Sequence, residues 1–308
     1  MAAQAQPDEA PGARPEGAWQ AGRFVLPLRH ALLMGIVNVT PDSFSDGGAH
    51  DAPAAALEHA RRLLDEGADI LDVGGESTRP GSQAIDDDEE WRRVGPVLRE
   101  LVRWNVPVSI DTYHPRTMRA ALELGVDIVN DVHALRRPGA LQAVAQSPDA
   151  GVCLMHMQGE PANMQQSPRY DDVVAEVATF LRQRAECLEG AGVERRRICL
   201  DPGFGFGKTR EHNLELGCRL EQLAALGYPL LIGVSRKSML AGTSKLPPLQ
   251  RIPASLGAAL ACVAAGARIV RVHDVAATRD AVRTFEAMRA CEPMQPPPAI
   301  RAPQAIRS

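Results

Sequence analysis

The sequence predicts a single (β/α)8 barrel with a short flexible tail at each end. The chain has 308 residues, of which 45% are hydrophobic, and this is ample for a large core. Short apolar segments alternate with longer segments of helical spacing eight times in about 270 residues. Most of the apolar segments lack hydrophobic–polar alternation, as expected for parallel strands buried on both faces. A doubly wound open sheet is the alternative that this pattern leaves open.

The elements follow one another in a regular order. The expected strands lie at 31–37, 69–73, 106–110, 126–129, 151–155, 197–200, 229–233 and 268–272. The expected helices lie at 53–66, 87–104, 115–124, 138–146, 170–190, 211–226, 252–266 and 275–290. Several helix–strand junctions contain a glycine, at Gly67, Gly125, Gly192 and Gly266. Glycine accepts the left-handed conformation that ends many helices, so these glycines indicate structure and not catalysis.

The two ends of the chain differ in composition from the barrel, which is expected to span residues 23–291. Residues 1–22 are rich in Ala, Pro and Gly and are predicted to form a disordered tail. Residues 292–308 contain PMQPPPAIRAP and are predicted to form a second flexible tail. The first residues lack an apolar core segment and contain acidic side chains, which argues against a signal peptide.

Composition excludes several classes of function. The formal net charge is −4 and no long basic stripe is present, so nucleic acid is not an expected partner. The longest apolar stretch, residues 252–267, contains Pro253 and Ser255 and is too short to span a membrane. The six cysteines are scattered without a C-x-x-C pair, which favours neither a zinc site nor a disulfide framework. A reduced cytoplasm is the expected compartment.

Polar residues stand at the carboxyl end of each expected strand, where a core residue would otherwise continue. A single Asp or Asn at such a position often caps the next helix. In a barrel, however, all eight ends converge on one face, so together they predict a small polar pocket. These residues are Asn38, the segment GGESTRPGS at 74–82, Asp111, Asn130, Asp131, Met155, His156, Asp201, Ser235, Arg236, Lys237, Arg271 and His273.

The types of these residues divide the pocket into two sides. Asp111, Asn130 and Asp201 offer acceptors that suit a flat heterocycle with N–H and NH₂ groups. Lys237 adds a donor for a ring carbonyl or nitrogen. The second side has donors typical of phosphate or carboxylate binding, namely Ser235, Arg236, Arg271 and His273.

Three further segments have simpler interpretations. DPGFGFGKT at 201–209 is glycine-rich, but Pro202 stands where a Walker A loop needs glycine and the dinucleotide spacing also fails. We interpret it as a tight turn that lets the backbone and Phe206 approach a ligand. The acidic run DDDEE at 86–90 is expected to open a solvated helix and not to bind metal. His156 is expected to be a packing residue or a support for its neighbours.

Longer motifs resemble those of a known family. MGIVNVTPDSFSDGG at 34–48 and ADILDVGGESTRPGS at 68–82 strongly resemble the two signature segments of the dihydropteroate synthases. The segments SIDTYHP, IVNDV, LMHMQGEPANMQ, LDPGFGFGKT, GVSRKSM and RVHDV resemble the remaining blocks of this family, in the same order. The resemblance covers about residues 24–290 and leaves out the tails.

The resemblance implies a (β/α)8 barrel that joins 6-hydroxymethyl-7,8-dihydropterin diphosphate to p-aminobenzoate with the help of Mg²⁺. The products would be 7,8-dihydropteroate and diphosphate, in a step of folate biosynthesis that sulfonamides inhibit. It also implies a homodimer formed through helices of the barrel wall. The reaction would be dissociative, with diphosphate leaving before the amine attacks.

The resemblance also implies a role for individual residues. The pterin ring would contact Asp111, Asn130, Met155, Asp201, Phe206 and Lys237. The diphosphate would contact Asn38, Thr78, Arg79, Arg271 and His273. The p-aminobenzoate would contact Phe44, Thr78, Arg79, Pro80, Phe206, Ser235 and Lys237. Mg²⁺ would bind Asn38 and Asp46. The residues expected to carry the chemistry are Asn38, Asp111, Asp201 and Lys237, and loops at 38–50 and 74–84 would close over the diphosphate.

Two other functions are alternatives for a barrel of this kind. A methyltetrahydrofolate-dependent methyltransferase resembles this barrel, but it has no reason to keep the diphosphate anchors Arg271 and His273. A non-catalytic pterin-binding paralogue would not need Asn38, Lys237 and His273 together.

Overall fold

The computed structural model describes residues 17–40, 52–77, 81–82, 84–240 and 246–290. Within these ranges eight strands form one parallel sheet in the order β8-β7-β6-β5-β4-β3-β10-β9. A parallel bridge between Leu200 and Leu230 links the two ends of the sheet, so the barrel is nearly closed. The prediction of a barrel is thus confirmed, and the alternative of a doubly wound open sheet is wrong. The strands are β3 (Leu32–Asn38), β4 (Ile70–Gly74), β5 (Val108–Asp111), β6 (Ile128–Asp131), β7 (Gly151–Met155), β8 (Ile198–Asp201), β9 (Leu231–Ile232) and β10 (Ile269–Val272).

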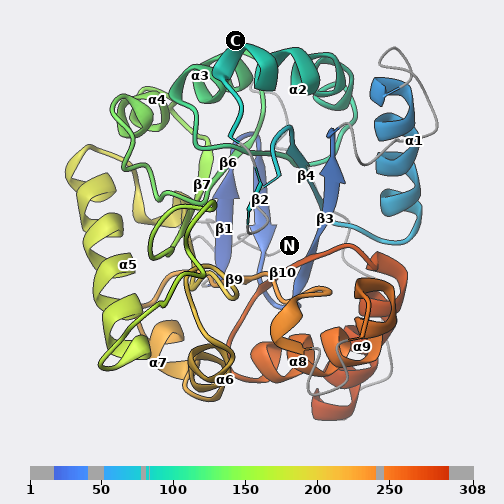
Figure 1. Cartoon of the computed structure of the whole chain (residues 1–308). Coiled ribbons are helices and arrows are strands. Elements are labelled where there is room, and N and C mark those ends of the chain that lie inside the picture. The colour runs from blue at the N-terminus through green and yellow to red at the C-terminus, as the bar shows by residue number, and fades with distance from the viewer. Residues whose placement is uncertain (1–16, 41–51, 78–80, 83, 241–245, 291–308) are drawn as a thin grey trace, which may run out of the picture.

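Helices surround the strands as an outer ring (Figure 1). Side-chain caps fix two of their starts, because Asp86 accepts from the Glu89 amide at 2.8 Å and Asp172 accepts from the Val174 amide at 3.0 Å. The α-helices are α1 (Ala52–Asp65), α2 (Asp87–Leu101), α3 (Pro115–Leu124), α4 (Ala140–Ala145), α5 (Val173–Gly190), α6 (Arg210–Cys218), α7 (Glu221–Ala224), α8 (Ile252–Ala264) and α9 (Val275–Ala290). Short 3₁₀ helices cover Arg195–Arg197, Ser238–Leu240 and Pro248–Arg251.

Two element predictions are corrected by the structure. The single helix expected at 211–226 is two helices, because α6 ends directly after Gly217, a residue of low helix propensity. The strand expected at 229–233 is only the two residues of β9, since Pro229 has no amide to donate to a neighbouring strand. The four junction glycines named above all have positive φ, as predicted.

A hairpin that the sequence analysis missed lies inside the ring of helices in Figure 1. Its strands are β1 (Ala18–Ala21) and β2 (Phe24–Pro27), which pair in antiparallel fashion. The boundary of the disordered tail at residue 22 was therefore wrong, and residues 1–16 and 291–308 lie outside the described residues. The side chains of Trp19 and Phe24 are fully buried. They pack against inward-facing residues near the amino ends of the barrel strands, namely Leu32, Met34, Ile70, Ile128, Cys153, Cys199, Leu231 and Ile269.

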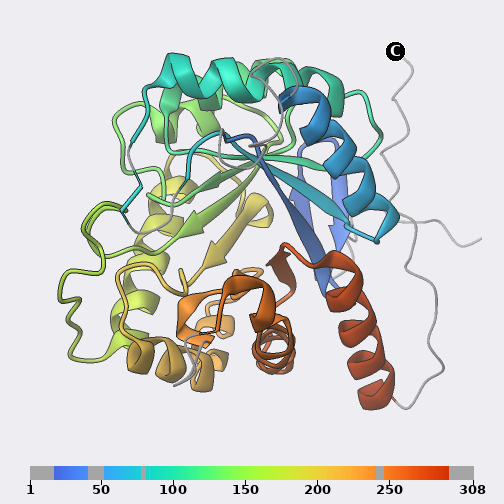
Figure 2. The same cartoon turned by 45° about the vertical axis from the view of Figure 1, so that its right-hand side comes forward.

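The hairpin closes the bottom of the barrel and leaves the opposite end for a site. Trp19 donates its indole N–H to the Arg197 carbonyl at 3.0 Å, and Arg23 pairs with the buried Asp127 at 3.1 Å. Figure 2 shows the barrel from another side, with the helices packed around the strands. Among the described residues, no helix has both the length and the apolar character needed to cross a membrane.

A Trp19→Phe change is expected to lower the free energy of unfolding by about 2 kcal/mol, because it removes a buried hydrogen bond and leaves a void. Urea unfolding followed by circular dichroism measures this loss. Trp104→Phe is a matched control, since Trp104 also donates its indole N–H, to Glu100 at 3.1 Å, but is only partly buried. Equal losses in the two variants would contradict the role given to the hairpin.

Candidate active site

Arg271 of β10 organises one side of the barrel mouth. Its Nε donates to Asp72 of β4 and its Nη2 to Asp111 of β5, each at 2.6 Å. Asn130 of β6 donates its amide N–H to the same Asp72 oxygen at 3.2 Å. Asp72 has no exposed surface, and one of its two oxygens has no hydrogen-bond partner. The side chains of four strands thus form one polar network, in which one buried acceptor atom has no hydrogen-bond partner.

The charged groups of this network shift one another's pKa values. Burial alone would lower the pKa of Arg271, but the carboxylates of Asp72 and Asp111 outweigh it and raise that pKa. Burial raises the pKa of Asp111 to about 7, with Arg271 opposing and Asp72 adding to the rise. Asp111 therefore changes its charge near neutral pH, while Arg271 stays a cation.

Asp201 and Lys237 form the other half of the ring-binding side. Asp201 ends β8 and accepts from the Gly203 amide at 2.7 Å. Lys237 donates to the Phe204 carbonyl, and its ammonium lies 4.3 Å from the centre of the Phe206 ring. Burial lowers the pKa of Lys237 to about 8, although Asp201 opposes this shift. Burial raises the pKa of Asp201, while Gly203 and Lys237 oppose that rise.

Lys208, which was not singled out from the sequence, stabilises the turn at 203–207 by hydrogen bonds to its backbone. Its buried ammonium contacts Nδ1 of His156 at 3.0 Å and the carbonyls of Gly203 and Phe206 at 3.0 and 3.1 Å. Burial lowers the pKa of His156 to about 2, so His156 is the neutral acceptor of this contact. His156 is thus a supporting residue, as predicted. A Cβ on Gly203 would lie 1.9 Å from the His156 carbonyl, so only glycine fits there.

Asn38 and His273, which were predicted to bind an anion, lie close to each other. The Ser235 hydroxyl lies 3.0 Å from Nδ1 of His273 and accepts from the His273 amide at 3.2 Å. Asn38 and His273 both line a cavity of about 320 Å³ between α1 and the ends of β3 and β10. The other lining residues are Ile36, Ala55, Glu58, His59 and Arg62. Arg236 was also predicted to bind an anion, but its guanidinium pairs with Asp274 at 2.8 Å.

An apolar wall completes the mouth. Tyr113, Val132, Met155, Met157 and Met164 form a buried cluster, and Phe206 packs against it. Met155 and Phe206 were predicted to contact a ligand ring, and the structure places them together. A flat ring could therefore lie against this wall while its polar edge reaches the network of carboxylates.

Some predicted residues lie outside the described residues. They are Phe44 and Asp46 in the first signature segment, and Thr78, Arg79 and Pro80 in the second. The remaining predicted site residues all come from carboxyl ends of barrel strands or the segments that follow them. These are Asn38, Asp111, Asn130, Met155, Asp201, Phe206, Ser235, Lys237, Arg271 and His273.

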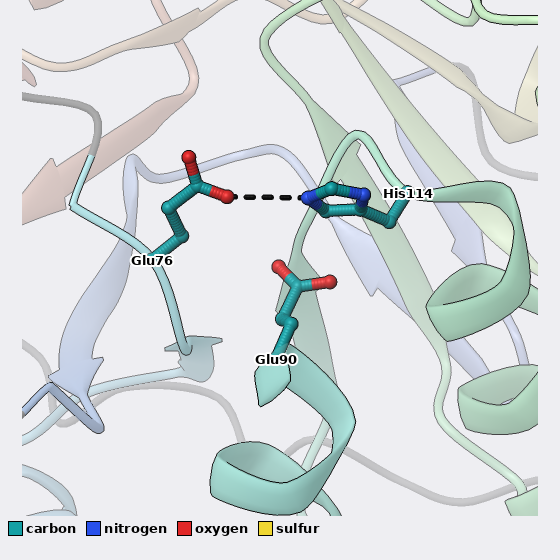
Figure 3. Close-up of side chains that lie close together, drawn as sticks. All are labelled: Glu76, Glu90 and His114. Atoms are coloured by element: carbon teal, nitrogen blue, oxygen red, sulfur yellow. Dashed lines mark hydrogen bonds and ion pairs between the residues drawn. The ribbon is translucent and has the colours of Figure 1, made fainter. Parts of the chain in front are cut away.

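The sequence analysis also missed Asp72 and a second buried cluster. A charged residue inside the apolar strand ILDVG was the signal for Asp72. The second cluster joins Glu76, Glu90 and His114, whose side chains point toward one another in Figure 3. Glu90 belongs to the acidic run that was expected to be solvated, yet it is 1% exposed. That expectation was wrong for Glu90, because one face of α2 packs on the barrel.

The fold and the mouth together define a barrel of the enzyme type, with polar, cationic and apolar groups suited to a flat polar ring beside an anion. Residues 34–273 match the family of pterin binding enzymes. The dihydropteroate synthase of Neisseria meningitidis serogroup C is 57% identical over 265 residues, which are 84% of this chain and 93% of the relative.

Solved structures agree with this likeness. The dihydropteroate synthase of Burkholderia cenocepacia, complexed with 7,8-dihydropteroate, is 48% identical with a TM-score of 0.81, over 89% of this chain and 97% of that one. The Yersinia pestis dihydropteroate synthase with a sulfonamide drug complex is 44% identical with a TM-score of 0.84, over 89% and 99% of the two chains. The chain belongs to the pterin-binding enzyme family and, within it, to the dihydropteroate synthases.

The pH dependence of the site follows from Asp111 and Lys237. Below about pH 7 Asp111 takes up a proton and loses an acceptor, and above about pH 8 Lys237 loses its charge. We therefore expect kcat/KM for the pterin substrate to be a narrow bell with limbs near these values.

The variant Asp72→Asn tests the acidic limb. Asp72 raises the pKa of Asp111, so its removal should move that limb to lower pH and leave the alkaline limb in place. Steady-state kinetics between pH 5.5 and 9.5, at roughly half-unit steps, would measure both limbs. An acidic limb that does not move would contradict the assignment to Asp111.

Proposed function

We propose that this barrel mouth condenses 6-hydroxymethyl-7,8-dihydropterin diphosphate with p-aminobenzoate, with diphosphate leaving before the amine attacks. One observation supports this more than any other. The charges of Asp111, Asp201, Lys237 and Arg271 lie close enough to shift one another's pKa, and the Lys237 ammonium lies 4.3 Å from the centre of the Phe206 ring, which packs on the apolar wall.

The two sides have separate tasks in this proposal. The carboxylates of Asp111 and Asp201 and the amide of Asn130 bind the N–H and NH₂ groups of the pterin, while Lys237 donates to a ring acceptor. Met155 and Phe206 pack against one of its faces. These groups bind through fixed hydrogen bonds, so the exocyclic methylene of the ring is held at a defined place.

Departure of the diphosphate is the difficult step, since an aryl amine is a weak nucleophile. Arg271 and His273 stabilise the negative charge that grows on the leaving group. Asp111 and Asp201 favour the positive charge that the electron-rich pterin spreads from its methylene. Arg271 bonds to Asp111 at 2.6 Å, so the group that stabilises the leaving group lies beside a group that stabilises the pterin cation.

The residues on the anion side suit Mg²⁺. Mg²⁺ prefers hard oxygen ligands and usually keeps several waters while it binds one or two protein groups and the substrate phosphates. The amide oxygen of Asn38 is such a ligand and lines a cavity of about 320 Å³ with room for them. Asp46 is the second predicted ligand and lies outside the described residues. When bound, Mg²⁺ would neutralise charge on the diphosphate.

A crystal soaked with both substrates and Mg²⁺ tests the order of bond changes. We expect diphosphate separated from a pterin cation against Met155 and Phe206, with the amine nearby. If the substrate instead shows inversion at an isotopically chiral methylene, and the rate depends steeply on the nucleophilicity of the amine, displacement is direct and the proposed order is wrong.

We also propose a homodimer, as the family resemblance implies, in the reduced cytoplasm that the scattered cysteines favour. The exposed Met288 on α9 is one apolar side chain that a second copy would cover. Sedimentation equilibrium would give the mass of the particle, and a mass of one chain at micromolar concentration would rule out a stable dimer.

A further inference from the structure

Glu76 stands at the base of the segment that follows β4, and two neighbours fix its carboxylate. Tyr113 donates its hydroxyl to Oε1 of Glu76 at 2.5 Å, and Nε2 of His114 lies 3.2 Å from Oε2 (Figure 3). Tyr113 and His114 are 4% and 3% exposed. Both come from the segment between β5 and α3, so a single carboxylate ties two neighbouring segments of the barrel mouth together.

This cluster is a hydrogen-bonded network and not a metal site. Glu76, Glu90 and His114 could bring three ligand atoms within 4.8 Å of one another. Both oxygens of Glu76, however, already face protein donors, and Oε2 of Glu90 accepts from Thr112 at 2.7 Å. Asp87 lies 2.7 Å from the other nitrogen of His114. The carboxylates therefore already have protein partners, whereas Nδ1 of His114 makes no hydrogen bond and faces Asp87 as an ion pair.

The network reaches the active site through Tyr113. The ring of Tyr113 belongs to the buried cluster with Met155 and Met157, and Phe206 packs against that cluster. Glu76 thus connects to the apolar wall by one hydrogen bond. On its other side the backbone is also fixed, since Arg93 donates to the Gly75 carbonyl at 2.9 Å.

We propose that Glu76 is a positioning residue for the p-aminobenzoate side of the active site. It holds Tyr113, and through Tyr113 the wall that includes Phe206, without touching the substrate itself. This inference rests on the proposed function, and on the contact between Phe206 and p-aminobenzoate that the family resemblance implies. A hydrogen bond to a charged group contributes more than a neutral one, so its loss should be measurable in binding.

The variants Tyr113→Phe and Glu76→Gln test the proposal. Each should raise KM for p-aminobenzoate about tenfold. KM for the pterin substrate should rise less, because the pterin also binds the polar network of Asp111, Asp201 and Lys237. Calorimetry should show the same loss in the equilibrium affinity for p-aminobenzoate. The double variant should lose little more than Tyr113→Phe alone, because Glu76→Gln weakens the hydrogen bond that Tyr113→Phe removes. If Glu76→Gln does not fold, Tyr113→Phe alone decides.

Tyr228→Phe is the matched control. Tyr228 is also buried and donates to a glutamate, Glu189, at 2.9 Å, but it precedes β9 at the opposite end of the barrel. It should lose stability without a change in either KM. Equal rises in both KM values, no rise, or full additivity in the double variant would overturn the proposal. A wild-type enzyme that makes no product would overturn the proposed function instead, and the calorimetry would still decide the role of Glu76.

Discussion

An Asp201→Asn change should lower kcat/KM for the pterin substrate about a thousandfold, the scale of losing one preorganised electrostatic group in a closed site. Asparagine keeps the shape and can still accept from the Gly203 amide, which contacts Asp201 at 2.7 Å. It removes the negative charge that faces Lys237 and would stabilise a pterin cation. The fold should therefore persist while the chemistry is lost, as measured by kinetics and circular dichroism.

Asp131→Asn is the control for this change. Asp131 is also a buried aspartate at a strand end, but its two oxygens accept from the amides of His133 and Leu135 at 2.7 and 2.8 Å. It caps a turn, so its replacement should cost stability and leave kcat/KM near the wild-type value. If both variants lose activity equally, the charge of Asp201 has no special role.

An Arg271→Met change should lower the free energy of unfolding by about 3–5 kcal/mol at pH 8, because two buried carboxylates lose their shared cation. Asp72 is fully buried and the side chain of Asp111 is 10% exposed. The pKa of Asp111 is already raised, and without Arg271 it should rise further. Its charged form is then disfavoured in the folded state, so the loss should shrink as the pH falls from 8 to 6.

Urea unfolding of Arg271→Met at the two pH values measures this effect. Adding Asp72→Asn should restore part of the stability, since one unpaired charge is removed. Arg219→Met is the control, because Arg219 pairs with Asp172 at 3.0 Å on the surface and should cost less than about 1 kcal/mol. If Arg271→Met lowers the free energy of unfolding equally at both pH values, the coupling between Arg271 and Asp111 is contradicted.

The strand ends were the part of the molecule that the sequence predicted best. A polar residue such as Asp111 or Asp201 after an apolar run marks the carboxyl end of a buried strand, and a barrel brings these ends together. The glycines at helix ends worked for a similar reason, since one backbone conformation favours one residue. Pattern and geometry agree at such positions.

Long-range contacts were the part that could not be predicted. The hairpin with Trp19 lies in an alanine- and proline-rich region, and only its contact with the barrel bottom favours the strands. The acidic run that opens α2 was expected to be solvated because acidic side chains usually are. Which of them is buried depends on how the helix packs, and Glu90 lies on the buried face. Arg236 was placed among the anion-binding residues by its type alone, whereas its pairing with Asp274 depends on the tertiary structure.

Release of diphosphate from the pterin substrate tests the central claim most directly. The wild-type protein with Mg²⁺ would be assayed with and without p-aminobenzoate, and both diphosphate and the pterin product would be measured. We expect sustained release, matched by 7,8-dihydropteroate, only when the amine is present. Sustained release at an equal rate without the amine, or none with both substrates, would contradict the account.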